Sequence, residues 1–293
     1  MPLIHRLAGF LGLFVALLLL LALRVADAPT GAGLRAALAP SAQRSALLAA
    51  EGRGLLRISP LGAVARVGRL PAGRPLDLAS SGPLVLLGTD QGLQLSVDSG
   101  HTWRRVREGQ FMAVAAAGAQ LWAGQWGGAL WHSRDGGRSW SVDSFPEAKP
   151  EFESIAADAQ GGAAAGTLLG LYQRVGSNWH RVSSVGDRVT AVSTRTGGFE
   201  AADWRGRIWR SRGGDWRLWN TVHAGVWAVT QDAMGTTSGL VVNGHSVPAL
   251  GGHEVTSLVR SGGALFAFAA PNRVFASTDS GGHWRLVFEG QAA

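Results

Sequence analysis

The sequence predicts an all-β fold, a seven-bladed β-propeller of four-stranded antiparallel blades preceded by an N-terminal hydrophobic helix. Three observations carry this prediction: one short motif occurs three times, tryptophans recur at nearly equal spacing, and short apolar runs alternate with Gly-containing turns. Apolar residues make up 46% of the 293 positions, and 42 residues are Gly. This composition is typical of many short strands joined by tight turns within one continuous array.

The repeated motif reads Ser-x-Asp-x-Gly-x-x-Trp and covers residues 96–103, 133–140 and 277–284. In such a turn a short Asp side chain accepts backbone hydrogen bonds, and Gly supplies a positive φ. The Trp ring then packs against the hairpin that it closes. The motif therefore predicts a structural β-hairpin and not an active site.

The motif tryptophans give the length of the repeat. Trp103, Trp140, Trp179 and Trp216 follow one another at spacings of 37, 39 and 37 residues, although the last two lie in hairpins without the full motif. The longer gap between Trp216 and Trp284 leaves room for a repeat without the motif at Val226–Leu250. Ser45–Val67 shows the same strand-turn-strand pattern, also without the motif. These repeats give seven blades, with six or eight left open because the terminal blade is degenerate.

The order of strands in a propeller blade predicts two different faces. The hairpins that join third and fourth strands, including the three motifs, lie on one face of the disc. The loops that join second and third strands lie on the other face with the links between blades. Two of these loops carry a Trp at the tip, Gln125-Trp126-Gly127 and Asp203-Trp204-Arg205.

The three motifs resemble the Asp-box of bacterial neuraminidase repeats. With the apolar N-terminal segment and the short repeats, residues 45–290 resemble the photosystem II assembly and stability factor family. That resemblance implies a compact seven-bladed Asp-box propeller on the lumenal or periplasmic side of a membrane. It also implies a non-catalytic assembly factor that holds a membrane protein or its soluble segment, often through an Arg-rich patch.

The N-terminal segment predicts export. Residues 7–23 carry no charge, and this length lies between a signal-peptide core and a short membrane span. We expect residues 1–24 to be a signal peptide or an uncleaved membrane anchor, and Pro29 after Ala26-Asp27-Ala28 favours the anchor. Residues 25–44 are expected to be an Ala/Pro/Gly linker with a helical turn near residues 34–38, and residues 45–293 the propeller. The location would be the periplasmic side of the bacterial inner membrane, or the soluble periplasm after cleavage.

The sequence predicts no catalytic, cofactor or metal site. Tyr172 occupies the hairpin position that Leu95, Trp131, Trp209 and Phe275 hold in other blades, which indicates packing and not a sialidase-type nucleophile. The run Glu147, Glu151 and Glu153 is explained by a solvated link between blades. His253-Glu254 lacks the second His of a zinc-binding helix motif, since Ser257 stands there. A net charge of +7, scattered along the chain, does not indicate nucleic-acid binding.

The candidate partner-binding residues lie on the face opposite the motifs. They combine Trp rings with neighbouring polar groups, a composition typical of interaction hot spots. They are Trp126, Trp204, Arg205, Asp203, Gln125, Arg188 and Trp227. Two interpretations stay open: the two loop-tip rings display apolar area to a partner, or they fold back and cap the propeller.

The sequence therefore predicts an exported, non-catalytic scaffold that binds a protein partner, one associated with the membrane. A carbohydrate-binding propeller, with sugar rings stacked on Trp126 and Trp204, is the first alternative. A sialidase-like glycosidase is the second.

Overall fold

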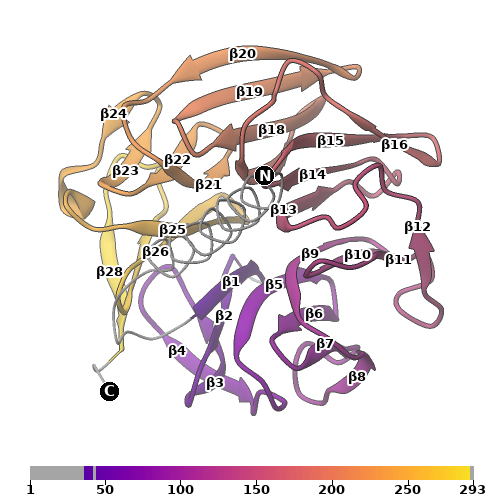
Figure 1. Cartoon of the computed structure of the whole chain (residues 1–293). Coiled ribbons are helices and arrows are strands. Elements are labelled where there is room, and N and C mark those ends of the chain that lie inside the picture. The colour runs from indigo at the N-terminus through magenta and orange to yellow at the C-terminus, as the bar shows by residue number, and fades with distance from the viewer. Residues whose placement is uncertain (1–35, 42–43, 291–293) are drawn as a thin grey trace, which may run out of the picture.

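The computed structural model describes residues 36–41 and 44–290. Within these residues the chain forms seven four-stranded antiparallel sheets, which Figure 1 shows arranged as blades around a central axis. Each sheet consists of four consecutive strands. The predicted seven-bladed β-propeller of four-stranded antiparallel blades is confirmed for this part of the chain.

The strands follow one another blade by blade. Blade 1 holds β1 (Ala36–Pro40), β2 (Ala46–Ala50), β3 (Gly54–Ile58) and β4 (Val64–Gly68). Blade 2 holds β5 (Pro75–Ser81), β6 (Leu84–Thr89), β7 (Gly92–Ser96) and β8 (Arg104–Arg107). Blade 3 holds β9 (Phe111–Ala117), β10 (Gln120–Gln125), β11 (Leu130–Ser133) and β12 (Ser141–Asp143). Blade 4 holds β13 (Phe152–Ala157), β14 (Ala163–Thr167), β15 (Gly170–Val175) and β16 (Asn178–Arg181).

The remaining blades repeat this order. Blade 5 holds β17 (Val189–Arg195), β18 (Gly198–Asp203), β19 (Arg207–Arg212) and β20 (Asp215–Thr221). Blade 6 holds β21 (Val226–Thr230), β22 (Ala233–Thr236), β23 (Gly239–Val242), β24 (His245–Ser246) and the 3-10 turn η1 (Pro248–Leu250). Blade 7 holds β25 (Val255–Ser261), β26 (Ala264–Ala269), β27 (Arg273–Ser277) and β28 (Arg285–Glu289).

The N-terminal boundary of the propeller differs from the prediction. Residues 25–44 were expected to be linker, with a helical turn near residues 34–38, whereas Ala36–Pro40 forms β1 and pairs with β2. Small residues suit a first strand, because this strand lies nearest the crowded axis. The segment 1–24 lies outside the described residues. Among the described residues no helix is long and apolar enough to span a membrane.

The core is divided among the junctions between blades. Every pair of neighbouring blades shares one cluster of buried apolar side chains, as at Leu86, Leu95 and Phe111 between blades 2 and 3. A single twisted sheet cannot bury both of its faces, so each blade buries them against its two neighbours. The cluster between blades 7 and 1 closes the ring.

The three motif turns, which we call the Ser-x-Asp hairpins, have the geometry that the sequence predicted. Ser133 Oγ donates to Asp135 Oδ1 at 2.8 Å and accepts from the backbone N–H of Gly137 at 2.8 Å. The Ser139 hydroxyl and backbone N–H both donate to Asp135 and hold the pKa of that carboxyl well below its usual range. Asp98 and Asp279 are held in the same way by residues of their own hairpins.

Gly137 also brings its hairpin against the preceding blade. Its φ is +84°, and a Cβ built there would lie 2.3 Å from Leu95 Cδ2 of blade 2. Gly100 and Gly281 stand in the same relation to Leu55 and Val242 of their preceding blades. The motif therefore needs Gly for its backbone conformation and for close approach between blades.

Candidate functional site

The predicted face is formed by one repeated contact. In blades 2 to 7 the backbone N–H at the tip of the second-to-third-strand loop donates to the carbonyl just before the first strand. Trp126 donates in this way to Gln110 at 2.9 Å, and Trp204 to Arg188 at 3.1 Å. The two tryptophans therefore occupy equivalent tip positions. We call this side of the disc the loop face, and the side with the Ser-x-Asp hairpins the hairpin face.

Four side chains from three blades meet on the loop face. The rings of Trp204 and Trp227 pack edge to face, with centroids 5.1 Å apart and an interplanar angle of 61°. The Arg188 guanidinium lies 5.4 Å from the Trp204 centroid and 5.7 Å from that of Trp227, and it pairs with Glu153 at 3.3 Å. We call Glu153, Arg188, Trp204 and Trp227 the aromatic cluster. The structure thus brings together three of the predicted site residues.

Trp204 is less exposed than expected, whereas Trp126 matches the expectation. The Trp126 side chain is 40% exposed at its loop tip. Trp204 is only partly exposed, because its ring packs on Trp227 and lies over the backbone of Gly225 in the next blade. Both interpretations of the loop-tip rings therefore hold in part: Trp126 displays apolar area, and Trp204 packs across a blade junction.

Gln125 and Asp203, predicted as partner-binding residues, serve the turns of the propeller instead. They stand at the register position that buried Thr89, Thr167 and Thr236 hold in other blades. Asp203 is fully buried. Its carboxylate accepts the backbone N–H groups of Arg205 and Arg207 and pairs with the Arg207 guanidinium. An unpaired carboxylate would be costly there, so Asp203 cannot face a partner.

Gln125 is held in a similar way. Its Oε1 accepts from the indole N–H of Trp131 at 3.2 Å, and the Arg107 guanidinium lies 4.4 Å from the centroid of that ring. Gln125, Asp203 and the three threonines all end a second strand, so aligning the repeats in the sequence distinguishes turn-forming residues from surface residues at this position.

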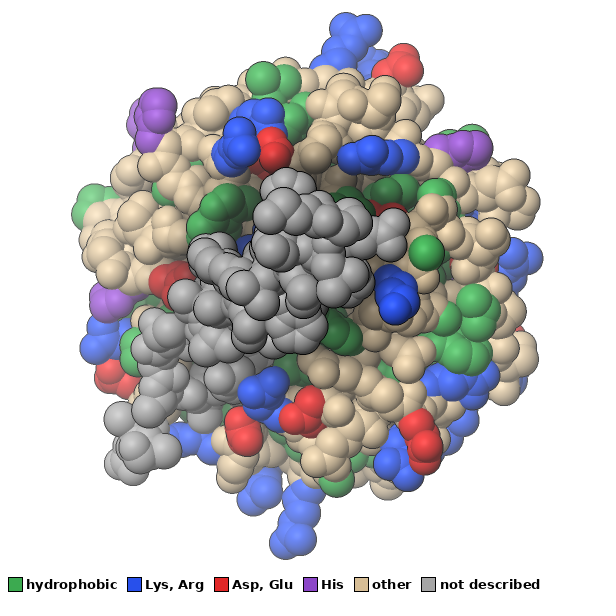
Figure 2. Space-filling model, in the orientation of Figure 1, with side chains coloured by type: hydrophobic (Ala, Val, Ile, Leu, Met, Phe, Trp, Pro, Cys, Tyr) green, Lys and Arg blue, Asp and Glu red, His purple; other side chains and the backbone are tan. Residues whose placement is uncertain are grey.

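Arg205 extends into solvent from the same loop, with 69% of its side chain exposed. Its Nε lies 3.6 Å from Asp187 Oδ2, so its charge is paired. On the face that Figure 2 shows, basic and acidic side chains lie beside one another and do not gather in a patch of one sign. The described part of the chain holds no group of three or more His, Cys, Asp or Glu that could bind a metal.

Tyr172 is packed and not poised as a nucleophile. The strand register places it level with Trp131, Trp209 and Phe275, as predicted, but Gln94 and not Leu95 is the equivalent in blade 2. Burial, together with the Glu147 carboxylate, raises the pKa of Tyr172 to about 12. Because a sialidase-type Tyr must give up its proton to act, this shift opposes that role.

The predicted acidic run is dispersed among separate partners. The Glu147 carboxylate accepts from the Thr167 hydroxyl at 2.8 Å, and the Glu153 carboxylate pairs with Arg188. These contacts hold the two carboxylates as structural groups.

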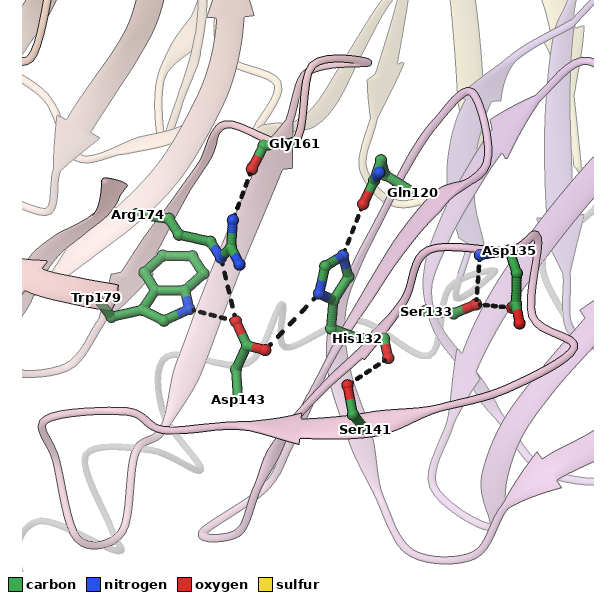
Figure 3. A network of polar contacts seen from close by, with 9 residues as sticks. All are labelled: Gln120, His132, Ser133, Asp135, Ser141, Asp143, Gly161, Arg174 and Trp179. Carbon is green, nitrogen blue, oxygen red and sulfur yellow. Dashed lines mark hydrogen bonds and ion pairs between the residues drawn. The ribbon is translucent and has the colours of Figure 1, made fainter. Parts of the chain in front are cut away.

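A second concentration of polar side chains lies inside the molecule, between blades 3 and 4 (Figure 3). Asp143 Oδ2 accepts from Arg174 Nε at 3.2 Å and from Trp179 Nε1 at 3.1 Å. His132 lies 3.7 Å from Asp143 Oδ1 and stacks on Trp122 with centroids 3.5 Å apart. The His132 side chain is 1% exposed, so this network joins two blades and offers no access to a substrate.

No protein-family model matches the chain, and no curated protein matches it. Among solved structures, the chain is similar to a streptogramin B lyase, with a TM-score of 0.63 and 9% identity over 85% of this chain and 91% of the lyase. It is similar to YCF48 bound to D1 peptide, with a TM-score of 0.53 and 19% identity over 70% of this chain and 77% of YCF48. It is also similar to an extracellular domain of BT4673 from B. thetaiotaomicron, with a TM-score of 0.59 and 14% identity over 88% of this chain and 38% of that one. At such identities the similarity is one of fold alone.

Proposed function

We propose that this chain is a non-catalytic scaffold that binds a protein partner through the loop face. The aromatic cluster is the observation that carries the proposal. Trp and Arg dominate the hot spots of protein interfaces, because they present large apolar area together with hydrogen-bond donors. The structure of YCF48 with a D1 peptide shows a propeller of similar fold with a bound peptide.

The aromatic cluster is prepared for binding by contacts among three blades. Arg188 is fixed between Glu153 and the two rings, so little side-chain freedom remains to be lost when a partner binds. Trp126 and Arg205 would extend the contact at the exposed loop tips.

We further propose that the chain is exported and held at the periplasmic side of the inner membrane, with the loop face toward the bilayer. The polarity of β1 supports this orientation. Ser80 Oγ donates to Pro40 O, and Ser261 Oγ donates to Ser41 O, so β1 ends beside the ends of β5 and β25. Ala36 therefore begins at the loop face. If residues 7–23 enter the membrane, the residues up to 35 extend at most about 40 Å, which keeps this face near lipid and near membrane-bound partners.

The absence of catalysis is part of the proposal, because streptogramin B lyase shows that this architecture also serves an enzyme. The residues that a glycosidase would use have other roles here. The pKa of Tyr172 is raised to about 12, and Glu147 and Glu153 bind Thr167 and Arg188. Binding without turnover is what the loop face supports best.

The test is affinity capture from solubilised membranes with the full chain, using wild type, Trp204→Ala, Trp227→Ala and the control Trp219→Ala. Trp219 is 44% exposed on β20, in the same blade as Trp204 but away from the aromatic cluster. We expect loss of Trp204 or Trp227 to weaken binding of a specific partner by about 1–3 kcal/mol and Trp219→Ala to retain it.

Equal capture by all four proteins would overturn the assignment of the loop face. A glycan array with the same proteins and Trp126→Ala covers the alternative ligand, since glycan binding that needs Trp126 or Trp204 would replace a protein partner. Release of the chain from membranes by carbonate washing would contradict the anchor.

A further inference from the structure

The junction between blades 4 and 5 contains an open pocket of about 270 Å³ on the outer rim of the ring. Two short turns explain why it is open. Only residues 176–177 join β15 to β16, and only residues 213–214 join β19 to β20. The longer Ser-x-Asp hairpins of blades 2, 3 and 7 lay a Gly against the preceding blade instead. At the junction of blades 4 and 5, where that hairpin is missing, part of the groove between the two blades stays uncovered.

One wall of the pocket is an aromatic ring in a fixed position. Trp216 of β20 is partly buried, and its indole N–H donates to Gln173 Oε1 of blade 4 at 2.5 Å. One part of the ring packs with the apolar cluster between the two blades, and another part lines the pocket. A flat apolar surface held in this way can receive the C–H face of a flat ligand at little entropic cost.

The other walls carry hydrogen-bonding groups. His180, Ser183, Ser184 and Asp215 line the pocket, and none of their side chains bonds to another residue in the part of the chain that the structure describes. Arg181 also lines it and donates one N–H to Leu169 O at 2.8 Å. The charges of Arg181 and Asp215 cancel, so the pocket favours a neutral ligand with several hydroxyl groups over an ion.

We infer that this pocket is a binding site for one saccharide ring. A pyranose ring has an apolar C–H face for Trp216 and a rim of hydroxyls for the donors and acceptors around it. An aromatic wall with a few placed polar groups is the usual composition of a small-ligand site. The site lies between the outer strands of blades 4 and 5, and none of its lining residues belongs to the aromatic cluster through which we propose that a protein partner binds.

The test is saturation-transfer difference NMR on the full chain in a phosphocholine detergent, with methyl glycosides of hexoses and N-acetylhexosamines as probes. Ser184→Arg places a long side chain in the pocket at an exposed position. The control Ser144→Arg makes the same change at an exposed serine in the link between blades 3 and 4. Asp215→Asn keeps the size of its side chain while removing an acceptor.

We expect saturation of the ring C–H protons of at least one glycoside by the wild type and by Ser144→Arg. Ser184→Arg should abolish it, and Asp215→Asn should weaken binding about tenfold. Absence of any glycoside signal with the wild type would overturn the proposal, as would a signal that Ser184→Arg leaves intact. Nucleosides, which also stack on Trp, serve as a competing probe, and binding of nucleosides alone would refute the saccharide assignment.

Discussion

The junction between blades 2 and 3 and the junction between blades 3 and 4 are closed by different means. At the first, the backbone of a Ser-x-Asp hairpin approaches the neighbour: Gly137 lies on Leu95, and the Trp140 indole N–H donates to the Gly137 carbonyl at 3.3 Å. At the second, side chains reach across: Asp143 of blade 3 receives Arg174 and Trp179 of blade 4 (Figure 3). The indole N–H of Trp140 is thus bonded inside its own hairpin, whereas that of Trp179 in β16 is bonded to the preceding blade.

This difference follows a pairing between one third-strand residue and the hairpin of the next blade. Before blades 3 and 7, which have a Ser-x-Asp hairpin, the residue is aliphatic, namely Leu95 and Val242; before blade 2 the contact of Gly100 falls on Leu55, two residues earlier in its strand. Before blades 4, 5 and 6, which have no such hairpin, it is polar, namely His132, Gln173 and Arg210. Gln173 accepts a hydrogen bond from Trp216 of the next blade, and Arg210 pairs with Asp232 of the next blade. His132 lies beside Asp143, whose carboxylate bonds to the next blade. The way in which a junction is closed therefore depends on residues of both blades.

The largest expected effect contrasts two glycines at positive φ. Gly137→Ala forces a Cβ into Leu95 as well as straining the turn, so we expect it to lower the free energy of unfolding by about 2–4 kcal/mol. Gly213→Ala, in the short turn of blade 5, meets nothing within 4 Å and should cost only about 1 kcal/mol. Urea unfolding followed by circular dichroism measures both, and equal losses would show that the close approach of Gly137 to blade 2 has no energetic role.

A smaller effect is expected at the side-chain junction. Asp143→Ala leaves the buried donors of Arg174 and Trp179 without their acceptor, which should cost about 2 kcal/mol of unfolding free energy. Asp143→Asn keeps one acceptor oxygen and should recover part of that loss. The same unfolding measurement decides the matter: an Asp143→Ala protein as stable as wild type would mean that the apolar cluster between blades 3 and 4 holds this junction without these hydrogen bonds.

The smallest expected effect is a dependence of stability on pH, and it arises where the first strands of neighbouring blades meet. Asp77 accepts the Val114 N–H between blades 2 and 3 at 2.7 Å, and Ser154 accepts the Val192 N–H between blades 4 and 5 at 3.0 Å. Burial raises the pKa of Asp77 to about 7 against the two N–H donors that lower it. The folded chain therefore holds this proton more tightly than the unfolded chain, and stability falls as pH rises from about 4 toward 7.

Asp77→Ser places a hydroxyl between blades 2 and 3, like the one that Ser154 supplies between blades 4 and 5. Between pH 5 and pH 7 the wild type should lose about 1 kcal/mol that the variant keeps, since the Asp77 side chain stays partly solvated. Unfolding curves at the two pH values, compared between the proteins, give this difference directly. Parallel pH profiles would assign the titration to other groups.

The architecture was predictable from the sequence, because the Ser-x-Asp-x-Gly-x-x-Trp motif acts within one turn and the repeat length fixes the blades. The segment Ala36–Pro40 was missed, since a strand of small residues next to the axis has the composition of a linker. The loop face was predictable from strand order alone. The contact of Trp204 with Trp227 was not, because it joins two blades and depends on how far one loop leans over Gly225.

Each blade consists of four consecutive strands, and within residues 36–41 and 44–290 no blade takes a strand from the other terminus. Instead, Ser261 meets Ser41 and the apolar cluster of blades 7 and 1 seals the last junction. In such a ring the strand topology does not require the chain to begin at one particular blade. Cutting the chain at another link between blades and joining the present ends would preserve every sheet, and duplication or loss of one blade would alter the circumference while leaving the rule for joining neighbours intact.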